Sequence, residues 1–373
     1  MDLLRLFLIF ALHINLVPGA PARPSFPRPR RDEPISPKVM ILSMWSPEAE
    51  IWQDRLPSST LGNLSRVVHS PGFSMLFPCA YCTENGHVCH LTIGEGEVNS
   101  AASLMALVLS SKFDLSSTYF LIAGIAGVNP KQGTLGTVAL ARYAVQVALQ
   151  YEIDPRSLPA EWPTGYISYG RDQPHEYPFI TYGTEVFELN AQLQDAAYRL
   201  ASKAELSDAD GPKQYRALYG RAGESYKSAI QPPSVVKCDT ATSDVYYSGS
   251  RLSESFENTT RSNFDRPPPG RTDLEHLFNT QQNGFSIAID NIFNAGVEIV
   301  KGIVQDWDST FKHGIETDNY VGDIFGSLGS EPDFGFGSLT RGERIAPKCR
   351  KSELAGREMD RRRILTQKSL RKI

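Results

Sequence analysis

The fold of this chain is constrained most by two stretches of sequence. In each of them a short apolar strand runs into a glycine turn. Residues 91–109 read LTIGEGEVNSAASLMALVL, and residues 118–138 read TYFLIAGIAGVNPKQGTLGTV. Glycine has no Cβ to obstruct a ligand, and it tolerates positive φ. In the first stretch a helix-like run starts behind Asn99 and Ser100, where unpaired N–H donors would point toward one place. Two such turns at adjacent strand ends predict a polar crevice in an α/β sheet.

The remaining pattern alternates between strands and helices, which is typical of the α/β class. The expected strands are residues 38–43, 119–123, the β-rich stretch 136–149, and a strand that begins at Ser234 and runs into a polar turn. One expected helix begins at Pro47 and another ends near Lys112. Two more are expected over 185–204 and 288–306. Residues 151–180 hold five prolines and are expected to be a loop.

Both ends of the chain differ in composition from its body. Residues 1–22 are apolar from Leu3 to Val17, end in Ala20-x-Ala22, and predict a secretory signal, so we expect a secreted or wall-associated protein. Residues 23–36 predict a linker rich in Pro and Arg. Residues 340–373 are expected to be a disordered tail, because from Arg341 onward they carry twelve Lys/Arg against four Asp/Glu. The rest of the chain is acidic, which argues against a nucleic-acid partner.

The five cysteines suit an oxidising compartment. Asn85-Gly86 is a hairpin signal, and counting outward from it places Cys82 opposite Cys89, within reach of a disulfide. A metal site and free thiols are the alternatives. The metal alternative would use Cys79, Cys82, His87, Cys89 and His90, but their spacing matches no common zinc pattern, so neither a metal nor a cofactor is expected. Asn63 and Asn258 begin glycosylation sequons.

Together the two glycine turns resemble those of the nucleoside phosphorylase and nucleosidase superfamily, and most closely those of the fungal purine nucleoside permease family. The resemblance covers about 37–339. It implies a single α/β domain with a mixed central sheet flanked by helices. It also implies that a purine nucleoside lies against both turns. The residues so implied are Gly94, Gly96, Asn99, Gly124, Ile125, Ala126 and Gly127.

The same resemblance implies roles for the base-binding end of the site. In TSDVYYSG, Tyr246 takes the place of the aromatic residue that stacks on the purine. In RSNFDRPPPG, Asn263 takes the place of the residue that addresses N7 of the leaving base. An Asn can donate to N7 but cannot protonate it. Asp265 lies nearby, and its alternative role is a cap or an ion pair with Arg266.

At the reaction end, Glu48 resembles the early acidic residue that holds the attacking water. The alternative is simpler, because an acidic residue in the first turn of a helix is common for reasons of the helix dipole. Glu95 and Glu97 in the first turn would oppose phosphate capture, so an enzyme built this way would hydrolyse rather than phosphorolyse. Arg142 and Tyr143 follow a predicted strand and are expected near the ligand.

Three functions remain open from the sequence. The first is purine nucleoside binding in service of uptake, with a separate membrane transporter as partner. The second is a secreted purine nucleoside N-ribosyl hydrolase, and the third is a truncated inactive relative. A homo-oligomer is expected in each case.

The chain departs from the family pattern between Tyr246 and Asn263, which are only 17 positions apart. Several tens of residues normally separate these two positions. They carry a carboxylate for the ribose diol together with a core helix and strand. Glu254 and Glu257 lie too close to Tyr246 to replace that carboxylate. We therefore expect a domain that lacks one internal strand–helix segment, with an unpaired strand edge, exposed apolar surface and reduced stability.

Overall fold

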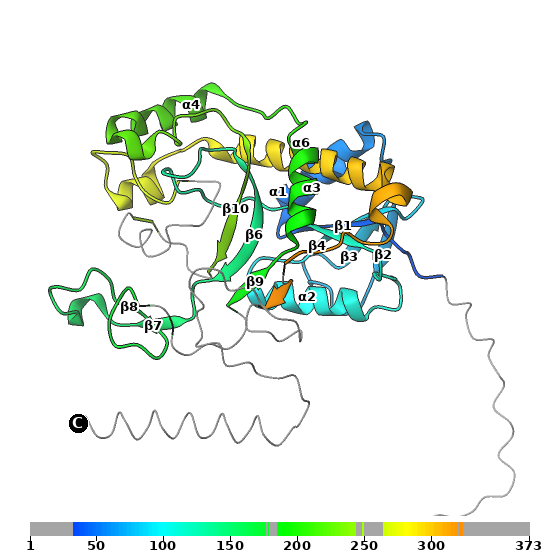
Figure 1. Ribbon diagram of the computed structural model, residues 1–373, viewed down its shortest axis with the longest axis horizontal. Coiled ribbons are helices and arrows are strands. Elements are labelled where there is room, and N and C mark those ends of the chain that lie inside the picture. Colours follow the sequence, from blue (N-terminus) through cyan, green and yellow to red (C-terminus); the bar gives the residue numbers. More distant parts are fainter. Residues whose placement is uncertain are drawn as a thin grey trace, which may run out of the picture. The chain divides into compact units, whose positions relative to one another are not determined.

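The computed structural model describes residues 33–176, 178, 185–243, 248–249, 264–319 and 321–323 of the chain (Figure 1). The chain divides into a unit of residues 1–33 and a unit of residues 34–373, and all described helices and strands belong to the second. The described α-helices are α1 (Ser46–Arg55), α2 (Glu97–Leu109), α3 (Ala191–Ala201), α4 (Asp210–Ala217) and α6 (Gly284–Gln305).

A five-stranded mixed sheet carries the glycine turns. Its order is β2-β3-β4-β1-β5, with β1 parallel to both β4 and β5. The strands are β1 (Val39–Ser43), β2 (Arg66–His69), β3 (Cys79–Cys82), β4 (Val88–Thr92) and β5 (Tyr119–Ile122). The two glycine turns follow β4 and β5, so they are not at adjacent strands as expected. Because β1 lies between them, its own carboxyl end is flanked by both turns.

The second mixed sheet has four strands in the order β10-β6-β9-β11. Its strands are β6 (Val138–Gln146), β9 (Val186–Glu188), β10 (Val235–Thr242) and β11 (Gly322–Asp323). β6 and β10 run parallel, which Figure 1 shows as two long adjacent arrows. The strands of the described residues are thus hydrogen-bonded as two main mixed sheets rather than as one central sheet.

Two expectations about local structure are corrected. Residues 151–180 are not all loop, because β7 (Gln150–Glu152) and β8 (Tyr166–Ser168) pair as a small antiparallel sheet. Residues 185–204 are not one helix, because Val186–Glu188 forms strand β9 before α3 begins. The Asn190 side chain accepts a hydrogen bond from Leu193 N and caps α3, which fixes where the strand gives way to the helix.

Alternate side chains of β1 enter two different cores. Ile41 packs in a cluster with Trp52 of α1 and Phe293 of α6. Met40 packs on the opposite face in a cluster with Leu107 of α2. Strand residues alternate between faces, so this five-residue strand, buried throughout, anchors helices on both sides of the sheet. In the part of the chain that the structure describes, no helix has the length and apolarity needed to cross a membrane.

The open edge expected from the missing segment is present. β5 ends the five-stranded sheet, and among the described strands none pairs with its outer side. Two of its side chains are exposed to solvent: Phe120 to 44% and Ile122 to 70%. Beyond β5, Val128 forms an isolated parallel bridge with Phe264, so the chain after the short interval lies against the continuation of this edge. The prediction of an unpaired edge with exposed apolar side chains is confirmed for the described residues.

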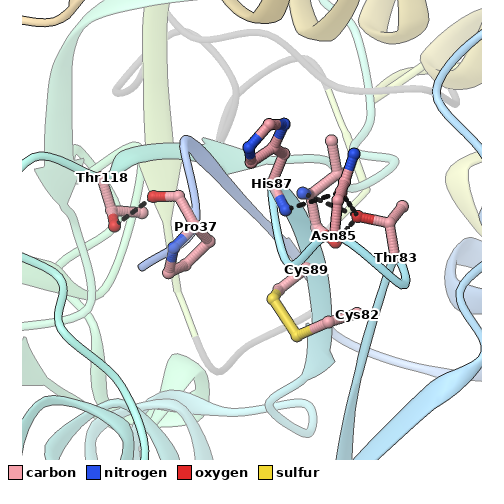
Figure 2. Close-up of a disulfide and its surroundings, with 8 residues drawn as sticks. Pro37, Cys82, Thr83, Asn85, His87, Cys89 and Thr118 are labelled. Carbon is pink, nitrogen blue, oxygen red and sulfur yellow. Dashed lines mark hydrogen bonds between the residues drawn. A yellow bond between two sulfur atoms is a disulfide. The ribbon is translucent and has the colours of Figure 1, made fainter. Parts of the chain in front are cut away.

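The cysteine hairpin forms with the predicted register. Cys82 pairs with Cys89 across β3 and β4, and their sulfurs form a disulfide (Figure 2). The Asn85 carboxamide oxygen accepts hydrogen bonds from Thr83 Oγ1 (2.7 Å) and from His87 N (3.0 Å), which closes the turn. Gly86 has a φ of +72°, whereas Asn85 does not have a positive φ. The turn is therefore not the two-residue mirror-image turn that Asn-Gly usually forms.

This disulfide should contribute measurably to stability. Closing its loop restricts the unfolded chain, and a loop with a sequence separation of 7 predicts about 2–3 kcal/mol. We expect the double substitution Cys82→Ala and Cys89→Ala to lower the free energy of unfolding by about that amount in a urea titration. A matched Cys238→Ala variant, which removes a thiol outside this disulfide, should change the free energy of unfolding much less. Equal effects of the two variants would contradict the prediction.

Candidate functional site

Glu48 occupies the carboxyl end of β1 in the first turn of α1. The residue is 1% exposed, and both carboxylate oxygens accept backbone hydrogen bonds. Oε2 accepts from Met44 N and Oε1 accepts from Ile125 N, each at 2.8 Å. Burial raises the pKa of Glu48 above its ordinary value, although these hydrogen bonds act in the opposite direction. The carboxylate therefore caps the start of α1 and also joins this helix to the turn after β5.

A fully buried histidine lies next to this carboxyl end of β1. Ser43 Oγ donates to the backbone oxygen of Glu48 at 3.3 Å and lies 2.9 Å from His90 Nε2. His90 Nδ1 is buried, and no described residue pairs with it. Burial lowers the pKa of His90 to about 4, because removal from solvent disfavours the charged ring. His90 is thus neutral at physiological pH.

The turn after β5 connects Glu48 to a cavity. Ile125 N contacts the carboxylate at one end of the turn, and Gly127 lines a cavity of about 580 Å³ at the other. Gly124 lies close to Glu48, since a Cβ there would stand 3.2 Å from Glu48 Oε1. Ala126 is exposed between them. Four predicted site residues of this turn therefore span the distance from the buried acid to the cavity.

Backbone hydrogen bonds of Asp265 bring three predicted segments together. Asp265 N donates to Val128 O at 3.3 Å, directly after the glycine turn. Gly249 N donates to Asp265 O at 2.9 Å, directly after the turn predicted to carry the stacking tyrosine. Asp265 itself lines the cavity, as does Ser248. The described residues 124–128, 248–249 and 264–266 therefore meet at one place, although they are far apart in sequence.

The carboxylate of Asp265 forms the ion pair that the sequence allowed as its alternative role. Its oxygens accept from Arg266 Nε at 2.9 Å and from Arg266 Nη2 at 3.1 Å, and both residues are buried. Tyr219 Oη donates to Arg266 O and fixes the segment further. No Lys or Arg is among the described residues that line the cavity. A cavity with this lining favours a neutral, partly aromatic ligand over a phosphate.

The start of α6 and the short helix η5 (Glu275–Asn279) form the opposite wall of the cavity. His276 and Gln282 hold Phe264 by its backbone. Gln282 Oε1 accepts from Phe264 N at 2.8 Å, and His276 Nε2 lies 2.7 Å from Phe264 O. Tyr215 Oη lies 2.7 Å from His276 Nδ1. Burial lowers the pKa of His276, so the ring is neutral and Nε2 is the donor to the carbonyl oxygen.

Sequence reasoning missed this wall. His276 and Gln282 have no motif spacing to the glycine turns, and only the tertiary structure places them at Phe264. Phe285 also lines the cavity, and its ring lies 5.8 Å from that of Trp45. Trp45 directly precedes α1, so this contact gives a second connection between the Glu48 region and the cavity. An aromatic residue one position after a helix start carries no signal that would have revealed this role.

The first glycine turn lies at the end of β4, on the other side of β1. Gly94 and Gly96 have φ of +91° and +84°, so both need glycine. Helix α2 begins at Glu97, so Asn99 lies inside its first turn, where Nδ2 donates to Glu95 O at 2.7 Å. None of these residues is among those that line the cavity. Their role toward a ligand stays a prediction.

Arg142 and Tyr143 lie at a different buried acid. Arg142 Nη2 pairs with Glu188 Oε1 at 2.5 Å, and Tyr143 Oη donates to the same oxygen at 3.3 Å. The expected position of these two residues near the ligand is not supported by these contacts. Tyr246 and Asn263 lie outside the described residues, so their predicted roles stay predictions.

The comparisons with known proteins agree with one another. A sequence model of the purine nucleoside permease family matches residues 36–262 and 259–316. A purine nucleoside permease of Candida albicans is 38% identical over 348 aligned residues, which cover 80% of this chain and 83% of that protein. A probable purine nucleoside permease of Schizosaccharomyces pombe is 32% identical over 324 aligned residues, which cover 73% of this chain and 90% of that protein.

These alignments also bear on the short interval before Asn263. The alignment of 348 positions covers 80% of 373 residues, about 298, so about 50 positions face a gap in this chain. The alignment of 324 positions covers 73%, which gives about the same number. The two parts of the family match meet at residues 259–262, between Tyr246 and Asn263. Both findings support the expectation that an internal segment of the family is missing from this chain.

Solved structures of nucleoside enzymes share part of the arrangement. A 5′-methylthioadenosine/S-adenosylhomocysteine nucleosidase from Helicobacter pylori has a TM-score of 0.41 at 12% identity, over 73% of this chain and 99% of that one. A purine nucleoside phosphorylase from Toxoplasma gondii has a TM-score of 0.39 at 11% identity, over 74% of this chain and 94% of that one.

The buried His90 predicts a specific pH dependence of stability. Its pKa is lower in the folded protein (about 4) than the ordinary 6.5, so the unfolded chain binds more protons between these values. Stability contributed by neutral His90 is therefore present above pH 6.5 and is lost as pH falls toward 4, by about 3 kcal/mol in total. His90→Gln keeps a partner for Ser43 but does not titrate. Denaturant titrations at several pH values should show a smaller loss in the variant, and equal losses would refute the assignment.

Proposed function

Because the chain belongs to the purine nucleoside permease family, we propose that it binds purine nucleosides in service of nucleoside uptake. The observation that carries the proposal is the meeting of three segments at Asp265, beside a cavity of about 580 Å³. A volume of this size is in the usual range for small-molecule sites. The ligand proposed is a purine nucleoside, with a separate membrane transporter as the partner that completes uptake.

The lining of the cavity suits the base of such a ligand. Phe285 is an exposed aromatic residue of the lining, the buried Phe264 and His276 line it as well, and Ser248 and Gln282 are among its polar residues. The His276 and Gln282 contacts with Phe264 fix the backbone on either side of that residue. They would thereby position Asn263, the residue proposed to donate to purine N7. Tyr246, two residues before Ser248, is proposed to stack on the base.

A second function, hydrolysis of the N-glycosidic bond, is favoured by the geometry of Glu48. Burial raises the pKa of its carboxyl, and a base works best when its pKa is near the working pH. Met44 N and Ile125 N donate to its two oxygens, and Trp45 contributes further hydrogen bonds to the carboxyl group, which fixes its orientation. In this proposal Glu48 holds the attacking water and Asn263 assists the leaving base. The third possibility, an inactive relative, is the outcome in which neither binding nor turnover is found.

Export of the chain is a separate proposal. The Cys82–Cys89 disulfide suits an oxidising compartment, and Asn63 of the first sequon is exposed. We expect cleavage after Ala22, so that N-terminal sequencing of secreted protein begins at Arg23. Recovery of intact Met1 from a soluble intracellular pool would contradict this.

The cavity can be tested by filling it. Ser286 is an exposed residue in the first turn of α6 that lines the cavity, and Ser309 is an exposed serine of the short helix Trp307–Phe311. We expect Ser286→Trp to weaken inosine binding at least about tenfold in calorimetry, because the indole occupies part of the site. The matched Ser309→Trp variant should bind like the unchanged chain. Loss of binding in both variants, or in neither, would contradict the location.

Stacking and hydrolysis can then be separated. Tyr246→Ala should weaken inosine or adenosine binding by about 1–3 kcal/mol, while Tyr246→Phe should be nearly neutral because it keeps the ring. Glu48→Gln should spare binding but abolish any ribose release. Its amide can accept only one of the two backbone hydrogen bonds, so a thermal melt must first show that the variant is folded. Binding without ribose release by the unchanged chain would favour uptake over hydrolysis.

A further inference from the structure

Two polar side chains on the η5 and α6 wall of the cavity are already used within the protein. Gln282 Oε1 accepts from Phe264 N at 2.8 Å, and Gln282 Nε2 lies 3.2 Å from His276 Nε2. Both ring nitrogens of His276 have partners, because Nε2 lies 2.7 Å from Phe264 O and Nδ1 lies 2.7 Å from Tyr215 Oη. These side chains hold the backbone of Phe264, so a ligand in the cavity meets them as groups that are already paired.

Apolar side chains of the same wall remain open to the cavity and to solvent. Leu277 of η5 and Phe285 of α6 both line the cavity, and Phe285 is 44% exposed. Leu274 and Phe278 lie on either side of Leu277 in the sequence and are 67% and 73% exposed. Covering apolar surface of this kind is favourable, whereas a polar group placed against it loses its hydrogen bonds to water. The wall therefore favours an apolar group of a ligand.

The edge of the purine that faces this wall follows from the proposed function, on which this inference rests. Ile125, which contacts Glu48, and Gly127, which lines the cavity, lie at opposite ends of the turn after β5. With C1′ of the sugar at Glu48, the base extends toward the cavity. Asn263 is proposed to address N7, and N7 shares one edge of a purine with the exocyclic group at C6. Because Phe264 directly follows Asn263, this edge runs toward the wall that holds Phe264.

We propose that the site selects purine nucleosides that carry an apolar substituent on the exocyclic nitrogen at C6. Such a secondary amine keeps one N–H, and Ser248 Oγ in the cavity lining is buried and pairs with no described residue. One hydroxyl thus meets one N–H, while Leu277 and Phe285 meet the substituent. An unsubstituted amino group places a second N–H against these apolar side chains, where its desolvation opposes binding.

The size of the cavity agrees with a substituted ligand. Its volume of about 580 Å³ lies in the middle of the range of about 300–1,000 Å³ that is usual for sites of drug-sized molecules. A nucleoside with one further ring is a molecule of that class. The exposed rim at Leu274 and Phe278 lets a longer substituent continue along the surface of the protein.

The test compares ligands on the whole chain by calorimetry. We expect N6-benzyladenosine to bind at least about tenfold more tightly than adenosine, because the benzyl ring leaves water for an apolar wall. The matched ligand is 5′-deoxy-5′-(benzylthio)adenosine, which carries the same benzyl group at the opposite end of the nucleoside. It should bind no more tightly than adenosine.

A pair of variants locates the effect in the protein. Leu277→Asn replaces an apolar side chain by a polar one of similar size, and it should lower the ratio of the adenosine and N6-benzyladenosine dissociation constants at least about threefold. The matched variant Leu109→Asn changes a 75% exposed leucine at the end of α2 and should keep the ratio. Two ligands are compared on the same variant, so a loss of stability alone does not move the ratio. Phe285→Ser gives the same comparison if Leu277→Asn does not fold.

The outcomes separate this inference from the proposed function. If adenosine binds and N6-benzyladenosine binds no more tightly, the inference is overturned while nucleoside binding stands. An equal gain from the two benzyl compounds, or a ratio that Leu277→Asn leaves unchanged, also overturns it. If none of the nucleosides binds, the proposed function fails and this inference fails with it.

Discussion

The hydrogen bonds of the buried Glu48 carboxylate hold the candidate site together. One oxygen accepts from Met44 N at the end of β1, and the other accepts from Ile125 N in the turn after β5. These two strands are neighbours in the sheet, so a single side chain ties two adjacent strand ends to the start of α1. Burial raises the pKa of this carboxyl, and only a fold that supplies two N–H donors can keep such a group inside.

Asp265 likewise joins separate segments of the chain, at the end of the turn after β5 that is away from Glu48. Its backbone hydrogen bonds to Val128 O and from Gly249 N join three segments, while Arg266 neutralises its carboxylate. His276 and Gln282 hold the preceding residue through its N–H and carbonyl groups. Side chains of η5 and of the residues just before α6 thus hold the backbone of one segment that lines the cavity. Such a wall can orient a ligand without presenting a charge to it.

Among the described strands, β5 is the edge of its sheet and exposes Phe120 and Ile122, which agrees with the unpaired edge expected from the short interval between Tyr246 and Asn263. Without the carboxylate that the resemblance implies for the ribose diol, we expect the chain to bind a nucleoside weakly and to turn over little or none of it.

The sequence by itself determined the elements with strong local signals. The strand before Glu48, the glycine turns, the Cys82–Cys89 pairing and the late amphipathic helix follow from alternation, positive-φ glycines and hairpin counting, all of which act within a few residues. Local pattern failed at residues 185–204, where the sheet turns Val186–Glu188 into a strand through pairing with β6. Only the tertiary structure decided that β1 separates the two glycine turns and that Arg142 pairs with Glu188. It alone brought His276 and Gln282 to Phe264, because contacts between residues far apart in the chain depend on how the elements pack, which no short-range pattern encodes.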